Sequence, residues 1–412
     1  MKGKKKSMVP RAIEGFQTSP QQTRIWKLHE EGGPCFSSCR ILIEGRLDKE
    51  LLKKALSLAV RQNSVLRTSF HHVPGLDAPL QVISDSESLQ WNEVITPDPG
   101  ELSQQDPCPD FDLLAGPPLK ASLFGGTGTY ILVLTGSAMC VDTVTLDLLF
   151  KQICESYAAL VTGGPAADLE PVQYLQVSEW FNELIEGKQK VYADWPKSPN
   201  LTLAGQLHPV EPVRFAHKMH SIRIPRRLLQ RIESLLNGFS VAPRVWWAAV
   251  LQVLLARLSG EEQVQIAYVH DGRVYEELQN VLGPCSYCVP VCADLNEDCS
   301  FLDVLQSTAK QFADVDSENA PFFRMPAVST PNDLTLCALE LQTSPANRVS
   351  AGVTFSMQSK ASHTEGFALK AVVAGSDDQT GFQLHYNPSF FTAEAIAQMS
   401  RCLVALMESA AA

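Results

Sequence analysis

The sequence lacks a long uninterrupted hydrophobic run. No apolar stretch reaches the roughly 20 residues that a helix needs to cross a bilayer, so we expect no membrane-spanning segment. The basic start at Lys2 and Lys4–Lys6 has no apolar stretch behind it, unlike a secretory signal. We therefore interpret residues 1–15 as a flexible leader and expect no membrane partner.

An excess of positive charge is also missing. The 34 lysines and arginines stand against 45 acidic residues, giving a formal net charge of −11. Nucleic acids and anionic membranes bind proteins largely through clustered basic side chains, so neither is an expected partner. An acidic partner protein would have to bind a local basic patch.

The eleven cysteines lack the regular, even-numbered spacing of a disulfide framework. We interpret them as reduced, mostly buried thiols, which indicates the cytoplasm. The densest group, Cys285, Cys288 and Cys292, is interrupted by the strand-like Val289–Val291 and has no histidine nearby. Because a second well-spaced C-x-x-C pair is absent, we favour buried thiols over a zinc site and expect no metal.

No repeat with a period of 20 to 50 residues is present, and 412 residues of which 45% are hydrophobic can build two lobes with separate cores. Small residues and proline at 161–167 mark a boundary, which predicts an N-terminal lobe at 16–163 and a C-terminal lobe at 164–412. Helical and strand-like patterns alternate in both lobes and predict an α/β fold. We expect these elements to be helices at 48–60, from 143 onward, at 246–258 and toward 407, with strands at 131–135 and 264–268.

Two short patterns imitate functional motifs. His71 and His72 directly follow a strand-like segment and precede the turn-like Pro74–Gly75, so we interpret them as exposed residues at a strand end. Gly125–Gly128 lacks the lysine and the helix that follow a phosphate-binding loop, and two strand-like runs flank it. This segment is expected to be a turn between strands.

Several segments in order carry a family resemblance. Ser19–Trp26 reads SPQQTRIW, Arg61–Phe70 reads RQNSVLRTSF, and Tyr174 and Trp180 bracket a third segment. Two more begin at Leu282–Gly283 and at Ala320–Phe322. Together these resemble the signatures of the condensation domain of nonribosomal peptide synthetases, which read S-x-A-Q-x-R-L-W, R-H-E-x-L-R-T-x-F, Y-x-D-F-A-x-W, I-G-x-F-V-N-T-L-P and V-P-F. The resemblance covers most of the chain.

The resemblance implies two lobes, each like chloramphenicol acetyltransferase, that form a V around a central channel. Substrates would arrive on the phosphopantetheine arms of acyl or peptidyl carrier proteins, with no tightly bound cofactor. A tailoring enzyme is a further partner that the family implies. The domain would be a monomeric part of a larger synthase.

The family's catalytic motif, H-H-x-x-x-D-G, is altered in this sequence. Residues 137–143 read SAMCVDT, and Asp142 sets the register. Ser137 and Ala138 then occupy the two histidine positions, and Thr143 occupies the glycine position. The second histidine, which the family uses in catalysis, is therefore Ala138 here.

Asp142 has a structural and a chemical interpretation. The resemblance implies that an arginine holds this aspartate, and we match that arginine to Arg67. A carboxylate beside an arginine has a lowered pKa and is a poor base near neutral pH, so we favour a structural ion pair. Asp147, five positions later, gives the spacing of heterocyclization domains out of register. A helix turns about 140° over five residues from its starting direction, so the two carboxylates would not share a face.

Other polar residues remain as channel candidates. Ser137 and Cys140 belong to the motif loop, and the resemblance brings Ser356 and Gln358 toward the same channel. A nucleophilic serine needs a base within hydrogen-bonding distance, and no histidine is adjacent in the sequence. We therefore interpret Ser137 as a loop residue.

Two classes of function remain open. A platform would dock loaded carrier proteins or recruit a tailoring enzyme without catalysis. An active transferase would form an amide, or another bond on a tethered acyl chain, by proximity and without the histidine. Amide formation is feasible because a thioester is already activated and an α-amine with a pKa of about 7.7 to 8.0 is partly neutral. Losing a general base slows a reaction by about 10² to 10⁴-fold without forbidding it. The chain retains the family's signature segments but lacks the histidine that would act as the base, and this combination favours the platform.

Overall fold

The computed structural model describes most of the chain. The described residues are 14–33, 35–96, 111–126, 128–164, 171–187, 192–196, 201–207, 216–296, 298–315, 322–324, 335–364, 366–376 and 379–412. Most of the predicted leader, the end of the 161–167 boundary segment and the start of the Ala320–Phe322 segment lie outside them.

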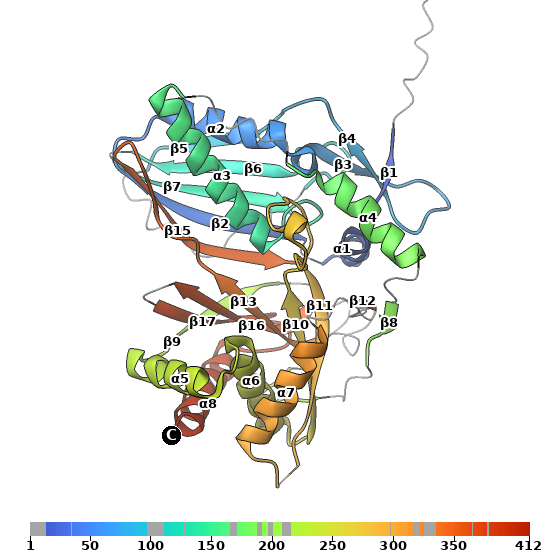
Figure 1. Ribbon diagram of the computed structural model, residues 1–412, viewed down its shortest axis with the longest axis vertical. Helices are drawn as coiled ribbons and strands as arrows, with labels where there is room; N and C mark the ends of the chain where they lie inside the picture. The colour runs from blue at the N-terminus through green and yellow to red at the C-terminus, as the bar shows by residue number, and fades with distance from the viewer. Residues whose placement is uncertain are drawn as a thin grey trace, which may run out of the picture.

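Two six-stranded sheets form the centre of the molecule, one above the other in Figure 1. The N-terminal sheet has the order β14-β15-β2-β7-β6-β5. Its strands are β2 (Phe36–Glu44), β5 (Gln90–Val94), β6 (Leu119–Gly125), β7 (Thr129–Ser137), β14 (Arg348–Ser350) and β15 (Val353–His363). Helices α2 (Lys49–Gln62) and α3 (Thr143–Thr162) pack on one face of this sheet and close the N-terminal core.

The second sheet has the order β11-β10-β13-β16-β17-β9. Its strands are β9 (Lys218–Arg223), β10 (Gln263–His270), β11 (Tyr287–Asp294), β13 (Thr335–Thr343), β16 (Phe367–Ser376) and β17 (Gln379–Tyr386). Four helices lie below it in Figure 1: α5 (Arg226–Phe239), α6 (Pro243–Ser259), α7 (Phe301–Val315) and α8 (Ala393–Ala410). Each sheet therefore has its own helical layer and its own core.

Smaller elements complete the fold. A three-stranded sheet joins β1 (Phe16–Gln17), β4 (Leu80–Ile83) and β3 (Thr68–His71), and β8 (Tyr192–Asp194) pairs with β12 (Phe322–Arg324). The remaining helical elements are α1 (Pro20–Glu30), α4 (Tyr174–Glu186) and the short 3₁₀ turns η1 (Ser64–Arg67) and η3 (Glu276–Leu278).

The helices begin and end where the sequence predicts. The carboxylate of Asp48 accepts a hydrogen bond from the Leu51 amide at 3.0 Å and caps α2. Gly260, in the left-handed conformation, ends α6 directly after Ser259. The strand predicted at 131–135 lies inside β7. Gly125 ends β6, and Gly128 lies in the connection from β6 to β7. The expected α/β fold is confirmed.

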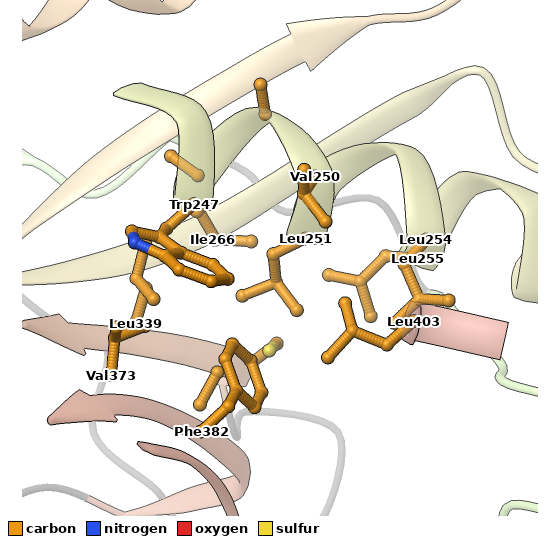
Figure 2. Packing of buried hydrophobic residues seen from close by; sticks show 14 of the residues in the cluster. Trp247, Val250, Leu251, Leu254, Leu255, Ile266, Leu339, Val373, Phe382 and Leu403 are labelled. Atoms are coloured by element: carbon orange, nitrogen blue, oxygen red, sulfur yellow. The ribbon is translucent and has the colours of Figure 1, made fainter. Parts of the chain in front are cut away.

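The C-terminal core is built around α6. Figure 2 shows side chains of this helix, including Trp247 and Leu251, directed toward Phe382 of β17 and Leu403 of α8. The Trp247 and Phe382 rings lie 5.6 Å apart, centroid to centroid. Because α6 is apolar on all sides, it is buried between the sheet and the other helices.

The lobes exchange chain segments, so a single cut at 163/164 does not separate them. Helix α3 does end at Gly163, as the predicted boundary requires. However, Tyr174, Val177 and Phe181 of α4 belong to the N-terminal core. Strand β15, far along in the sequence, pairs with β2 over the whole length of that strand. Cross-strand register depends on contacts between distant segments, so this exchange could not be predicted from local sequence patterns.

No single described helix is long and apolar enough to cross a bilayer. Helices α5 and α6, which meet at a bend of 115°, are together long and apolar enough by length and composition alone.

Replacing Phe355 of β15 with alanine tests whether this late segment supports the N-terminal core. Phe355 is 1% exposed and its ring meets that of Tyr157 edge-on at 5.4 Å. We expect the free energy of unfolding to fall by about 3 to 5 kcal/mol, because a buried aromatic side chain leaves a cavity. Urea unfolding measures this loss, and a decrease below about 1 kcal/mol would show that β15 is dispensable for the core.

Candidate functional site at the junction of the two sheets

The motif loop connects the end of β7 to the start of α3. Its backbone is held on both sides: the Ser137 amide donates to the Pro118 carbonyl at 2.8 Å, and the Val141 amide donates back to the Ser137 carbonyl at 2.9 Å. The Ala138 amide donates to the Cys35 carbonyl at 3.0 Å. The loop is therefore a fixed part of the fold.

Side chains from neighbouring elements hold the same loop. Gln22 of α1 donates its amide nitrogen Nε2 to the Met139 carbonyl at 3.0 Å, and the Ser37 hydroxyl of β2 donates to the Val141 carbonyl at 2.6 Å. Ser137, Ala138, Met139, Cys140 and Val141 are all 0% exposed. Ser137 and Ala138, which the sequence predicts to match the family's two histidines, are thus closed to solvent in this structure.

Asp142 is bound by Arg273, and the predicted pairing with Arg67 is wrong. The guanidinium of Arg273 donates two hydrogen bonds to the carboxylate, Nη1 to Oδ2 at 3.0 Å and Nη2 to Oδ1 at 3.1 Å. Both side chains are 1% exposed. Arg67 instead donates to the backbone carbonyls of Val60 and Ser84 beside β3. It stabilises the N-terminal lobe locally.

The Asp142 carboxylate also accepts hydrogen bonds from both lobes. Thr145 of α3 donates its amide at 2.7 Å and its hydroxyl at 2.6 Å, so Asp142 is the N-cap of this helix. Across the junction, the Cys285 and Ser286 amides donate at 3.1 and 3.2 Å, and the Ser286 hydroxyl donates at 2.9 Å. Burial alone would raise the pKa of Asp142, but the Arg273 charge and these hydrogen bonds lower it below its usual range. Asp142 is a permanently charged structural group and a poor base.

The backbone before Arg273 places its side chain at the junction. Gly272 adopts a φ of +75°, and a Cβ atom there would lie 1.9 Å from the Cys285 carbonyl oxygen. Only glycine permits this close approach. The sequence contained a signal, since Gly272–Arg273 lies shortly after the predicted strand at 264–268, but the L-R-T match led to the pairing with Arg67.

The strand candidates Ser356 and Gln358 do not meet the motif loop. In β15 it is His363 that pairs with Phe36, which in turn pairs with Ser137 of β7. Ser356 lies seven residues away along the strand, about 23 Å at about 3.3 Å per residue. Gln358 is exposed beside a β-bulge. These two predicted channel residues are not brought to the site.

Neither polar side chain of the loop is an activated nucleophile. The Ser137 hydroxyl lies 3.3 Å from the Met139 amide, which donates to it, and no histidine of the described residues is hydrogen-bonded to it. The Cys140 thiol is fully buried, and burial raises its pKa far above the usual range. A thiol held protonated is a poor nucleophile near neutral pH.

Thr143, at the family's glycine position, bridges the two sheets. Its hydroxyl donates to Oε1 of Glu340 on β13 at 2.7 Å, and Gln342 donates to the same oxygen at 3.1 Å. The other carboxylate oxygen of Glu340 forms an ion pair with Lys370 of β16 at 2.5 Å. Glu340 is 4% exposed. Sequence reasoning missed this network, because no short-range pattern connects β13 with α3.

Asp147 makes a second bridge one helical turn further along α3. Its carboxylate forms an ion pair with Lys360 of β15, which also donates to the Thr343 carbonyl of β13 at 2.6 Å. Asp142 therefore faces Arg273 while Asp147 faces Lys360, as expected for positions that do not share a helix face. The arrangement does not present two carboxylates to one substrate.

Three histidines gather where β15 leaves the N-terminal sheet. The His217 ring lies 4.1 Å from that of His363 and 4.9 Å from that of His385. Nδ1 of His385 lies 3.2 Å from Nε2 of His217, within hydrogen-bonding distance. Burial, together with the neighbouring imidazoles and Lys370, lowers the pKa of His363 and of His385 well below the usual range. The phenyl ring of Phe36 packs on His363 and separates this cluster from Ser137.

The cysteine group is divided between two environments. Cys285 is part of the N-terminal core, whereas Cys288 packs with Ala267 and Ala338 of the C-terminal sheet. Within the described ranges, no three histidine, cysteine or acidic side chains are arranged to hold a metal ion. His71 ends β3, as predicted, but it is half-buried, whereas His72 is exposed as predicted.

A family model described as "Condensation domain" matches residues 14–412. The chain belongs to the condensation-domain family. Chondramide synthase cmdD of Chondromyces crocatus is 26% identical over 419 residues, covering 94% of this chain and 11% of that protein. Phosphinothricin tripeptide synthetase PhsB of Streptomyces viridochromogenes is 25% identical over 395 residues, covering 89% of this chain and 33% of that protein. This condensation domain thus spans a small part of the curated relatives it matches.

Solved structures share the fold of this condensation domain. One is titled as a complex of the X-domain and OxyB from teicoplanin biosynthesis, with a TM-score of 0.77, 20% identity and coverage of 98% of this chain and 94% of that one. Another is the condensation domain from the monacolin K polyketide synthase MokA, with a TM-score of 0.78 and 15% identity. The match covers 97% of this chain and 98% of that one. The two-lobed fold, with each lobe like chloramphenicol acetyltransferase, is confirmed.

Replacing Arg273 with alanine should strongly destabilise the condensation domain. The Asp142 carboxylate would stay buried without its counter-ion, which costs about 3 to 5 kcal/mol. Arg348→Ala is a matched control, because its ion pair with Glu155 is exposed and such pairs contribute at most about 1 kcal/mol. Urea unfolding of both variants, with Arg67→Ala alongside, tests the pairing. A larger loss for Arg67→Ala than for Arg273→Ala would refute it.

The histidine cluster should make stability depend on pH. His363 and His385 stay neutral in the folded state, whereas in the unfolded chain histidines take up protons below about pH 6.5. The unfolded state then binds more protons, so the free energy of unfolding falls as pH falls, by about 2 kcal/mol between pH 7.5 and 5.5. The other titratable groups that face His363 and His385 are His217 and Lys370, and Lys370 forms an ion pair with Glu340.

The double variant His363→Asn/His385→Asn should lose most of this pH dependence. His72→Asn, at an exposed position, serves as the control and should keep it. Denaturant unfolding at the two pH values measures both. Equal slopes for all three proteins would show that the cluster does not take part in the pH response.

Proposed function

We propose that this chain is a condensation-type platform in a nonribosomal peptide or hybrid polyketide synthase. It binds intermediates carried on the phosphopantetheine arms of acyl or peptidyl carrier proteins and recruits a tailoring enzyme. It does not form peptide bonds by the histidine mechanism of its family. The cytoplasm, expected from the cysteine usage, is the location that goes with this role.

The closed motif loop is the observation that carries the proposal. Ala138 occupies the position of the catalytic histidine, is 0% exposed, and has its amide committed to Cys35. General-base catalysis needs a titratable group within hydrogen-bonding distance of the reacting proton. The loop offers instead a buried hydroxyl and a thiol whose pKa is raised, so it supplies no base.

The bridge from Thr143 to Glu340 supports the same conclusion. Glycine at this position would leave space beside the catalytic group, whereas the threonine hydroxyl reaches across to β13 at 2.7 Å. Its partner Glu340 is already committed to Gln342 and Lys370. Beside the motif loop, these hydrogen bonds join the two lobes.

Likeness to a recruitment domain supports the second half of the proposal. The structure titled as a complex of the X-domain and OxyB pairs a protein of this fold with a second protein. Its 20% identity establishes the shared fold, and recruitment by this chain is our inference. A fold built from two lobes with separate helical layers offers wide outer surfaces for such a partner.

Intact-protein mass spectrometry of loaded carrier proteins separates the platform from a transferase. Carrier proteins bearing acyl and aminoacyl thioesters are incubated with the domain, and binding is measured in parallel by calorimetry. We expect binding of the loaded carriers without transfer above a control that lacks the domain. Transfer above that control would establish an active transferase that works by proximity, and absent binding would remove the platform role.

Restoring the histidine provides a separate test. Ala138→His places a larger polar ring in a closed position, so we expect a loss of about 1 to 3 kcal/mol in stability and no efficient transfer. Unfolding and the mass-spectrometric assay measure the two effects. A well-folded variant with robust amide synthesis would show that only the base had been lost.

A further inference from the structure

Gln21, in the first turn of α1, is a buried amide without a partner. Its side chain is 2% exposed, and within the part of the chain that the structure describes neither Nε2 nor Oε1 has a hydrogen-bond partner. Most buried polar side chains in folded proteins are hydrogen-bonded, because an unsatisfied amide loses its bonds to water. A glutamine kept in this state reduces stability and calls for another explanation.

Gln21 directly precedes, on α1, a residue that contacts the motif loop across the seam between these two elements. The next residue, Gln22, donates to the Met139 carbonyl at 3.0 Å. One turn along the same helix face, the Ile25 carbonyl accepts from the Cys35 thiol at 3.6 Å, and the Cys35 carbonyl accepts from the Ala138 amide. Contacts on both sides of Gln21 therefore lead to the loop in which Ala138 replaces the histidine.

The family signature resembled by Ser19–Trp26 carries alanine where Gln21 stands. Alanine has no polar atoms to satisfy, so this chain has gained an amide beside the site at which it has lost an imidazole. The two changes lie on neighbouring elements of one site. A structural role would provide the new amide with partners, and none is present among the described residues.

We propose that Gln21 binds a secondary amide of the tethered intermediate, an inference that rests on the proposed function. A carboxamide carries one acceptor and two donor hydrogens, so it can accept from the N–H and donate to the C=O of one ligand amide. The pantetheine arm contains such amides, and so does a peptidyl chain. Access requires the seam to widen, because the side chain is 2% exposed.

Two substitutions separate ligand binding from a structural role. Gln21→Ala restores the family residue, and Gln21→Leu keeps most of the volume without the amide. Both should raise the melting temperature, since an unsatisfied buried amide is removed. Gln230→Ala, at an exposed position of α5, is the matched control and should leave both stability and binding unchanged.

Two probes distinguish the source of the amide. Acyl-pantetheine carries amides only in the arm, and a dipeptidyl thioester of ethanethiol carries one only in the peptide. We expect the wild type to bind at least one of them, and both Gln21 variants to bind that probe about tenfold more weakly by titration calorimetry. The probe that loses affinity identifies the arm or the peptide as the source.

Equal affinities of the wild type and both variants would overturn the inference while leaving the platform intact. So would failure of the wild type to bind either probe while it still binds a loaded carrier protein. If the loaded carrier does not bind either, the proposed function falls as well. A lowered melting temperature in Gln21→Leu with unchanged binding would assign Gln21 a structural role.

Discussion

The buried ion pair between Asp142 and Arg273 is the constraint on which the site depends. The carboxylate caps α3 in the N-terminal lobe, while the guanidinium comes from the connection between β10 and β11 in the C-terminal lobe. The guanidinium also donates to the Gly283 carbonyl at 2.9 Å, so it orders that connection too. One pair therefore fixes the motif loop, the start of a helix and the lobe junction together.

This constraint is compatible with the platform that we propose. In the predicted register, Ala138 replaces a group that would take part in the reaction, whereas Asp142 contributes to folding, so a loss at position 138 leaves the ion pair intact. The bridges from Thr143 to Glu340 and from Asp147 to Lys360 add to the junction. These contacts hold the lobes together whether or not a catalytic group acts between them.

Local patterns predicted what local physics decides. The Asp48 cap, the helix that follows Asp142 and the glycine that ends α6 were all readable, because each depends on residues within a few positions. The family resemblance predicted the two-lobed fold, which is confirmed. Both successes rest on short stretches whose meaning does not depend on the rest of the chain.

Long-range pairing was the part that could not be predicted. The partner of Asp142 lies 131 positions away, and the choice of Arg67 followed a motif that in fact holds β3. Ser356 was misplaced because strand register, which puts His363 in line with Ser137, is set by pairing across the sheet. Glu340 and Gln21 carry no sequence signal beyond being polar, and their burial became visible only in the fold.

A double-mutant cycle between Asp142 and Arg273 tests the central claim most directly. Urea unfolding of Asp142→Asn, Arg273→Met and the combined variant gives the coupling energy between the two side chains. If this pair holds the junction, the coupling exceeds about 2 kcal/mol and the combined variant is more stable than the sum of the single losses predicts. A coupling near zero would contradict the account, because the two residues would then stabilise the lobes independently.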